Sequence, residues 1–194
     1  MAITGITNYT FEEFLLVDYD ELRQINEFLQ WLSPIQEFEF EDETIQLLEL
    51  DSLSFGDVTN VRDYLSDGNP ESLVEIAKLI TGLDTDQSYR IPIIEFYGIL
   101  NTIKAREKQL ATMEQNELHQ EPDADWILVN GSEKMGQFGV LNIIDDLAGG
   151  DICKWEAVEN LPYWTVIQKL RMNKTMASLQ RAIASNKKQR QNNK

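Results

Sequence analysis

The apolar positions of this chain recur mostly at spacings of three and four residues, and Gly, Pro and Asp interrupt them, which is typical of consecutive helices. Thr10 and Glu13 have the spacing of a capping box, so a helix is expected to begin at Thr10. The apolar spacing continues to Leu32 with a break near Asp18, and Pro34 ends it. One or two helices are therefore predicted in this region.

The segment EFEFE (residues 37–41) follows a different pattern, because Phe38 and Phe40 alternate with glutamates. This period of two is the signature of a half-buried strand. We expect a small hairpin near residues 36–50, with its turn at Asp42-Glu43. The second strand would carry Ile45, Leu47 and Leu48.

Gly, Asn and Pro predict where the next helices begin and end. Ser54 is placed to cap a first helix, and Gly68 is placed to close it. Asn69 and Pro70 occupy the cap and first position of a second helix, where the missing N–H of Pro costs nothing, and Gly82 ends it. Two short antiparallel helices are expected from this punctuation.

One long helix is predicted for residues 91–121 (IPIIEF to NELHQE). Its first half carries apolar residues along one side, and its second half loses them, so the second half is expected to project from the core. Residues 119–136 then form a predicted linker. Within it, DWILVNG (residues 125–131) fits either a strand or a segment bound to a partner.

The C-terminal part again shows clear helix punctuation. After Phe138, a helix is expected to end at Gly149-Gly150, Asp151 should cap a short helix, and Pro162 should open the last one. The apolar residues of this last helix are Val166, Leu170, Met172, Met176, Leu179 and Ile183.

The predicted fold is mainly α, a multi-helix bundle with a small β-hairpin near residues 36–50 and a C-terminal helical hairpin. No internal repeat at a fixed period is visible. The segments we expect are an N-terminal helix with the hairpin (1–52), a helical body ending in the long helix (53–118), a linker (119–136), a C-terminal helical segment (137–185) and a basic tail (186–194).

Charge is distributed unequally along the chain. Residues 1–164 hold nine Lys/Arg and all thirty-three Asp/Glu, a net charge of −24, whereas residues 165–194 hold eight Lys/Arg and no acid, a net charge of +8. An acidic body repels nucleic acid, so the tail alone offers a surface for phosphate. The same tail fits the acidic body of a neighbouring copy, as in a homo-oligomer, and we favour protein as its partner.

Two features bear on where the chain works. No apolar run approaches the roughly 20 residues of a membrane-spanning helix, and the N-terminus lacks the basic and apolar regions of a secretory signal. Cys153 is the single cysteine, so no internal disulfide can form. We expect a reducing cytoplasm, no membrane, and Cys153 as a small buried hydrophobic side chain.

Candidate catalytic and metal-binding residues are few. The sequence has no phosphate-binding glycine loop, and its single histidine, His119, lies in a charged predicted linker. Soft zinc ligands are limited to His119 and Cys153. Residues 84–95 have the acid spacing of an EF-hand, but Tyr89 stands where that loop needs Gly, and Pro92 follows. A helix-capping loop fits this segment better.

Asp145, Asp146 and Asp151 are the remaining carboxylate candidates. Neighbouring residues on a helix point about 100° apart, so Asp145 and Asp146 do not share a face. Asp151 stands where a helix cap belongs. We therefore expect these acids to be structural and the protein to be no enzyme, with no cofactor and no metal.

Large aromatic rings gather near the predicted turns of the C-terminal segment. Such rings pack in a core or, when exposed, anchor interfaces. Together with the last helix and the tail they give the predicted partner-binding set, which is Trp155, Tyr163, Trp164, Leu170, Lys187, Lys188 and Arg190.

The stretch FGVLNIIDDLAGGDICKWEAVENLPYWTVIQKLRMNKTMASLQRAI (residues 138–183) resembles the C-terminal part of tail assembly chaperones and related morphogenesis proteins of tailed bacteriophages. The preceding helices, from LSFGDV to IIEFYGIL, are similar to the small helical body of that group, so the resemblance covers residues 53–183. The Gly149-Gly150-Asp151 turn with Trp155, and Leu161-Pro162-Tyr163 at the start of the last helix, match the family pattern.

This resemblance implies a non-enzymatic assembly role. Such chaperones bind tape-measure and tail-tube proteins and keep them soluble until they polymerise, which would place the protein in the host cytoplasm during assembly. The EFEFE region and the Lys-rich tail do not match the family. That difference leaves open a second role as a permanent virion component, in a neck, ring or tail or as a packaged protein. A third reading, an acidic DNA mimic that inhibits a DNA-binding protein, fits the acidic body but not the basic tail.

Overall fold

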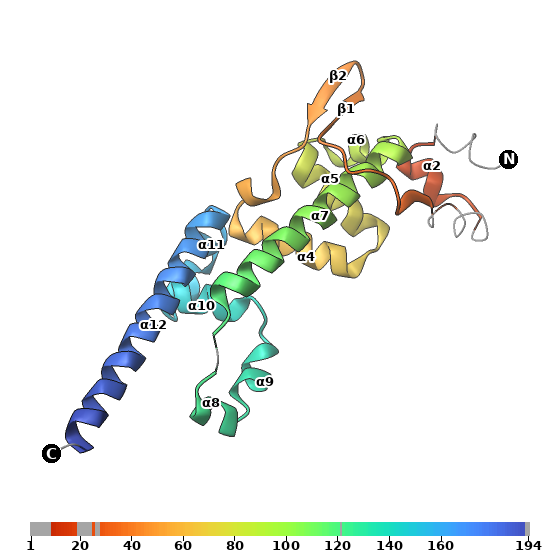
Figure 1. Ribbon diagram of the computed structural model, residues 1–194. Coiled ribbons are helices and arrows are strands. Elements are labelled where there is room, and N and C mark those ends of the chain that lie inside the picture. The colour runs from red at the N-terminus through yellow and green to blue at the C-terminus, as the bar shows by residue number, and fades with distance from the viewer. Residues whose placement is uncertain (1–8, 19–24, 26–27, 121, 193–194) are drawn as a thin grey trace. The chain divides into compact units, whose positions relative to one another are not determined.

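The computed structural model of the protein describes residues 9–18, 25, 28–120 and 122–192 (Figure 1). The described chain is mainly α, with a two-stranded antiparallel sheet and a long C-terminal helix, which confirms the predicted fold class. Contacts between residues divide the chain into two compact units. We call them unit 1 (residues 1–53 and 57–110) and unit 2 (residues 54–56 and 111–194).

The first described helix is α2 (Phe11–Leu15), and the predicted capping box stands at its start. The Thr10 hydroxyl accepts a hydrogen bond from the N–H of Glu13 at 3.2 Å, and the Glu13 carboxylate accepts one from the N–H of Thr10 at 2.9 Å. The predicted beginning of the helix is therefore confirmed. Much of its predicted continuation lies outside the described residues, at positions 19–24 and 26–27.

The predicted hairpin is present as β1 (Glu37–Phe40) and β2 (Glu43–Gln46). Phe40 pairs with Glu43, so the turn consists of Glu41 and Asp42, and the turn that we predicted one residue later is wrong. Glu41 and Asp42 have positive φ angles of 50° and 66°. The favoured two-residue turns of hairpins need this left-handed backbone, because it matches the twist of the strands. The prediction also placed Leu47 and Leu48 in the second strand, and this is wrong, because β2 ends at Gln46.

The helices of the central part are α4 (Phe55–Asp67), α5 (Pro70–Thr81), α6 (Thr85–Tyr89) and α7 (Ile93–Leu118), preceded by the short 3-10 helix η1 (Leu50–Ser52). The predicted punctuation of α5 is confirmed. The Asn69 side chain accepts a hydrogen bond from the N–H of Ser72 at 2.8 Å, and Gly82 ends the helix with a φ of 75°. Asp84 caps α6 in a capping box with Gln87, as expected of a helix-capping loop.

The core of unit 1 forms where α2 meets α7. The rings of Phe11 and Phe96 stack with their centroids 3.8 Å apart, and both side chains are buried. The backbone N–H of Phe11 donates to the carbonyl of Ile91 at 2.9 Å, and that of Ile93 donates to the carbonyl of Tyr9 at 2.7 Å. Each large apolar side chain buried in this way contributes about 1.5–3 kcal/mol to the free energy of unfolding.

Unit 2 contains α8 (Ala124–Leu128), α9 (Gly131–Gly136), α10 (Leu141–Ala148), the 3-10 helix η2 (Ile152–Lys154), α11 (Trp155–Glu159) and α12 (Tyr163–Asn192). The predicted linker thus holds two short helices. Its segment 125–131, which we left open between a strand and a partner-bound segment, lies in α8, in the turn after it and at the start of α9. The long predicted helices α7 and α12 are confirmed.

Two expectations about unit 2 are wrong. The last turns of α7 do not simply project, because the carboxylate of Glu114 accepts a hydrogen bond from the hydroxyl of Tyr163 on α12 at 2.7 Å. Cys153, expected to be buried, is exposed. It lies in the single turn of η2, where the N–H of Cys153 bonds the capping carboxylate of Asp151 at 3.1 Å and leaves the side chain at the surface.

The two units share one local plan. In unit 1, α5 ends at the left-handed Gly82, Asp84 caps the short helix α6, and Pro92 precedes the long helix α7. In unit 2, the same order is α10, the left-handed Gly149, the cap Asp151, the short helices η2 and α11, and then Pro162 before α12.

In both units, the proline before the long helix pairs with a residue that directly precedes a different helix. Thr10 forms an antiparallel bridge with Pro92, and Ser54 forms one with Pro162. These two pairings interleave along the chain, because Ser54 lies between Thr10 and Pro92. The arrangement is therefore no tandem repeat, and it agrees with the absence of a fixed period in the sequence.

Candidate protein-binding surface

The aromatic residues of the predicted partner-binding set have different positions. Tyr163 is completely buried, so its ring belongs to the core of unit 2. Trp155 is half-buried, and its indole N–H donates to the carboxylate of Asp145 at 3.1 Å. Trp164 is 40% exposed and packs edge-on against Tyr163 with centroids 5.3 Å apart. Trp164 is thus the member of this trio that keeps a large exposed surface.

The remaining members of the set all lie on α12. Leu170 is half-buried, and Lys187 and Arg190 are exposed. Lys188 is also part of the helix, but its side chain lies outside the described residues. Since α12 runs to Asn192, most of the predicted basic tail continues the last helix.

One side of α12, which we call the inner face, contacts the rest of unit 2. Its first turns bury Tyr163, Val166 and Ile167. Farther along, the guanidinium of Arg171 lies 3.3 Å from the carboxylate of Glu117, and the ammonium of Lys174 donates to the Glu117 carbonyl at 2.7 Å. Basic residues of α12 therefore contact an acidic residue in the last turns of α7.

The opposite side of α12 carries an exposed apolar stripe, which we call the outer face. Its side chains are between 54% and 66% exposed, and they are Met172, Met176, Leu179 and Ile183. Each residue of an α-helix turns by about 100°, so Met172 lies about 180° around the helix from the buried Tyr163. The spacings of four, three and four residues keep the stripe on one side.

The sequence prediction missed this division, because it placed Val166 and Leu170 together with the outer-face residues as one apolar series. The spacing of these residues in the sequence already indicated two different faces. Val166 and Met172 are six residues apart, or about 240° around a helix, so they cannot share one face.

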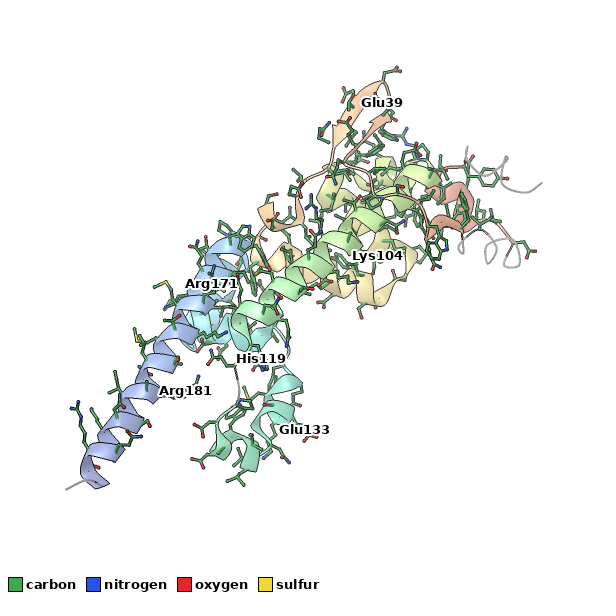
Figure 2. All side chains as sticks on the ribbon, viewed as in Figure 1. Glu39, Lys104, His119, Glu133, Arg171 and Arg181 are labelled. Atoms are coloured by element: carbon green, nitrogen blue, oxygen red, sulfur yellow. The ribbon has the colours of Figure 1, made fainter. Side chains whose placement is uncertain are left out.

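A shallow groove follows the outer face. Its volume is about 450 Å³, and it is lined by Gln168, Arg171, Met172, Thr175, Met176 and Leu179. Methionine side chains are flexible and polarisable, so they adapt to the shape of a bound partner. The groove is mostly apolar. Its charged member is Arg171, which lies at the border of the two faces because its guanidinium also pairs with Glu117; Figure 2 labels this residue.

A larger groove of about 910 Å³ lies between α12 and the segment that contains α8 and α9, and it is lined by residues that include His119, Trp126, Ser132, Ala177 and Arg181. The indole N–H of Trp126 donates to the hydroxyl of Ser132 at 3.1 Å, and Arg181 donates to the side chain of Gln120 at 3.0 Å. His119 and Arg181 are seen in Figure 2.

The carboxylates that we weighed for catalysis have structural contacts. Asp145 accepts the hydrogen bond from Trp155, and Asp151 caps η2 and forms an ion pair with Lys154 at 3.1 Å. Among the described residues, no group of three His, Cys, Asp or Glu is placed to hold a metal ion. Burial raises the pKa of the Tyr97 hydroxyl above its usual value, and Tyr97 lines neither groove.

No protein-family model, curated protein or solved structure matches this chain.

None of the described helices combines the length and the apolar composition needed to cross a membrane.

Proposed function

We propose that this protein is a non-enzymatic morphogenesis protein of a tailed bacteriophage that acts by binding other phage proteins, in the manner of a tail assembly chaperone. The observation that carries the binding role is the outer face of α12, where four large apolar side chains remain exposed. Contiguous exposed apolar surface of this kind marks sites of protein–protein interaction. The phage assignment rests on the resemblance of residues 138–183 to that family.

The charge of α12 supports a protein partner. The helix carries seven Lys/Arg and no Asp/Glu, and the rest of the chain is strongly acidic. A basic helix on an acidic protein selects partners by charge as well as by apolar contact, because the field of each partner steers their encounter. Tape-measure, tail or neck proteins are the proposed partners.

A permanent place in the virion is the second candidate, and the same outer face favours it. A free protein that exposes this stripe is prone to aggregate, whereas a virion component has it covered in the assembled particle. The two candidates differ in when the partner covers the helix.

Mass spectrometry with copy-number calibration, applied to purified infectious particles and to lysate of infected cells, tests the proposal. A chaperone is absent from particles and is recovered from lysate in a complex with a tail protein. A virion component is present in particles at a fixed copy number. Absence from particles together with no phage protein bound in the lysate would contradict both.

A further inference from the structure

The helices α7 and α12 begin in the same way, and buried positions of their first turn correspond. Since α7 starts at Ile93 and α12 at Tyr163, adding 70 to a residue number in α7 gives the matching position in α12. Phe96 thus matches Val166, and both side chains are buried. The correspondence allows the surroundings of the two helices to be compared position by position.

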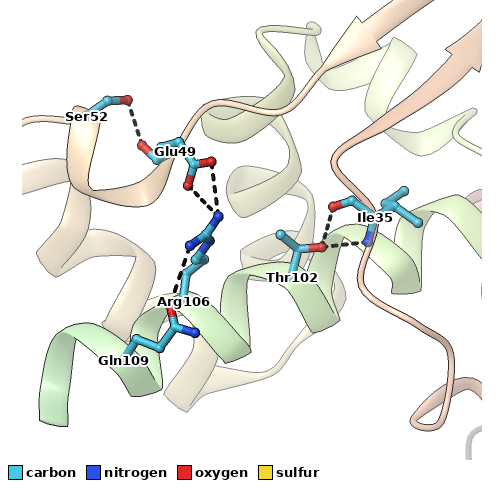
Figure 3. Close-up of polar contacts among 6 residues, drawn as sticks. All are labelled: Ile35, Glu49, Ser52, Thr102, Arg106 and Gln109. Atoms are coloured by element: carbon cyan, nitrogen blue, oxygen red, sulfur yellow. Dashed lines mark hydrogen bonds and ion pairs between the residues drawn. The ribbon is translucent and has the colours of Figure 1, made fainter.

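On α7, part of this matched surface is covered by the segment that contains residues 28–35 of the same unit. The amide of Asn101 donates to the carbonyl of Leu32 at 2.9 Å. The hydroxyl of Thr102 accepts from the N–H of Ile35 at 2.8 Å, as Figure 3 shows. A Cβ at Gly98 would lie 3.1 Å from Ile35, so the segment approaches the helix backbone closely. Under this cover Thr102 is only 4% exposed.

On α12 the described residues leave the matching side chains largely exposed. Gly98, Asn101 and Thr102 correspond to Gln168, Arg171 and Met172, which line the outer groove and are exposed. The difference follows from what comes after the paired residues Thr10 and Ser54. After Thr10, α2 ends at Leu15 and the chain goes on to the segment that covers α7; after Ser54, α4 continues as a helix to Asp67.

We propose that the outer groove of α12 binds an amphipathic helical segment of a partner protein, with Asp and Glu beside its apolar residues. The groove matches the surface of α7 that residues 28–35 cover within this chain. This inference rests on the proposed function as a binding protein and names the chemistry of the partner. A bound helix presents apolar residues at i, i+3, i+4 and i+7, which fits the spacing of the outer face.

The basic side chains of α12 favour an acidic partner. Lys169 lies three residues before Met172, and Lys187 lies four residues after Ile183, so basic side chains extend both ends of the stripe. Arg171 lines the groove as well, but its guanidinium is already paired with Glu117. An acidic helix gains ion pairs at Lys169 and Lys187, as Glu117 does with Arg171.

A second copy of this chain fits less well. Among the described helices, α12 alone exposes large apolar side chains at four positions spaced in this way. Pairing two copies of α12 would bring seven Lys/Arg of one against seven of the other, with no acid on either helix. Like charges that face each other across an interface destabilise it.

Fluorescence anisotropy with three designed 18-residue peptides tests the inference on the full chain. The first peptide carries Leu at the 4-3-4 spacing with flanking Glu, the second has the same Leu residues with flanking Lys, and the third has flanking Glu with its Leu residues out of register. We expect the first peptide to bind at least tenfold more tightly than the other two, and more weakly as salt is raised.

Two matched double variants locate the binding site. Met176→Glu with Leu179→Glu should weaken binding of the first peptide at least tenfold. Ser178→Glu with Ala182→Glu changes the net charge equally at exposed positions of α12 outside both grooves, and it should change binding less than threefold. Circular dichroism checks that both variants keep the helix content of the parent.

A charge reversal tests the choice of partner directly. Lys169→Glu with Lys187→Glu should lower affinity for the Glu-flanked peptide and raise it for the Lys-flanked one. Equal binding of all three peptides, or no binding of the first, would overturn the inference. So would a parent chain that sediments as a dimer and becomes a monomer in Met176→Glu with Leu179→Glu, because a second copy would then be the occupant.

The results distinguish failure of the acidic-helix inference from failure of the proposed function. If no peptide binds while the chain is still recovered from infected cells with a tail protein, the acidic-helix inference is wrong and the assembly role stands. If the peptide binds but no phage protein accompanies the chain and particles lack it, the assembly role is wrong and the groove remains a helix-binding site.

Discussion

At the scale of single residues, burial separates side chains that stabilise the fold from those available to a partner. Tyr163 and Trp164 are neighbours in sequence, yet the first is completely buried and the second is 40% exposed. The hydroxyl of Tyr163 is held by Glu114. A tyrosine in this setting affects stability, whereas an exposed tryptophan is available for contact.

Tyr163→Phe should lower the free energy of unfolding by about 1 kcal/mol, because it removes the hydrogen bond to Glu114 and keeps the ring. Urea unfolding followed by circular dichroism measures this change. Tyr9→Phe, at an exposed position, is the control and should stay within about 0.5 kcal/mol of the parent. A Tyr163→Phe variant with unchanged stability and lost partner binding would contradict the core assignment.

Thr102→Val is the second prediction at this scale. Valine keeps the shape of threonine but cannot accept the hydrogen bond from the N–H of Ile35, so a part-buried donor loses its partner. We expect a loss of about 1–3 kcal/mol in the free energy of unfolding, measured by urea titration. Thr85→Val, at the exposed first position of α6, should change stability by less than about 0.5 kcal/mol. Equal effects of the two substitutions would argue against the contact.

At the scale of elements, the shared plan predicts that the two units respond alike to the same change. Gly82 and Gly149 end α5 and α10 with φ angles of 75° and 71°, and an added Cβ would meet no atom within 4 Å at either position. The cost of a side chain there comes from the left-handed backbone alone.

Gly82→Ala and Gly149→Ala should each lower the free energy of unfolding by about 1–2 kcal/mol. Gly136→Ala, in helix α9 and also without a close neighbour, should instead leave stability unchanged or raise it by up to about 1 kcal/mol, because Ala favours the helix. Thermal and urea unfolding of the three variants measure these differences. A large effect at one cap and none at the other would contradict the shared plan.

The same elements show what sequence alone could predict. Caps and breaks such as Thr10, Asn69 and Gly82 depend on residues within one turn of helix, so the pattern located them correctly. The pairing of Thr10 with Pro92 joins positions far apart in the chain, and no local signal specifies it. For the same reason the sequence did not reveal the plan that the two units share.

The candidate site was predictable only in part. The basic and apolar character of α12 was visible in the sequence. Which side of α12 packs against the rest of unit 2 depends on contacts with Glu114 and Glu117. Tyr163 therefore entered the predicted binding set although it is buried. Met176, Leu179 and Ile183 were recognised as apolar but not as a separate exposed stripe.

At the scale of the whole molecule, basic charge and a regularly spaced exposed apolar stripe occur together on one helix. The chain has a net charge of −16, yet α12 carries seven Lys/Arg and no acid. The four exposed residues of the outer face lie on this same helix. Under the proposed function, α12 is the surface that meets the partner, and the acidic remainder of the chain disfavours nucleic acid as that partner.

Affinity isolation of the tagged chain from infected cells, with the bound phage proteins quantified by mass spectrometry, tests this account most directly. The parent chain and the control variant Ser178→Glu with Ala182→Glu should recover the same tail or neck protein. Met176→Glu with Leu179→Glu should recover at least tenfold less of it. Equal recovery by all three chains, or no phage protein with any of them, would contradict the claim that the outer face of α12 is the binding surface of an assembly protein.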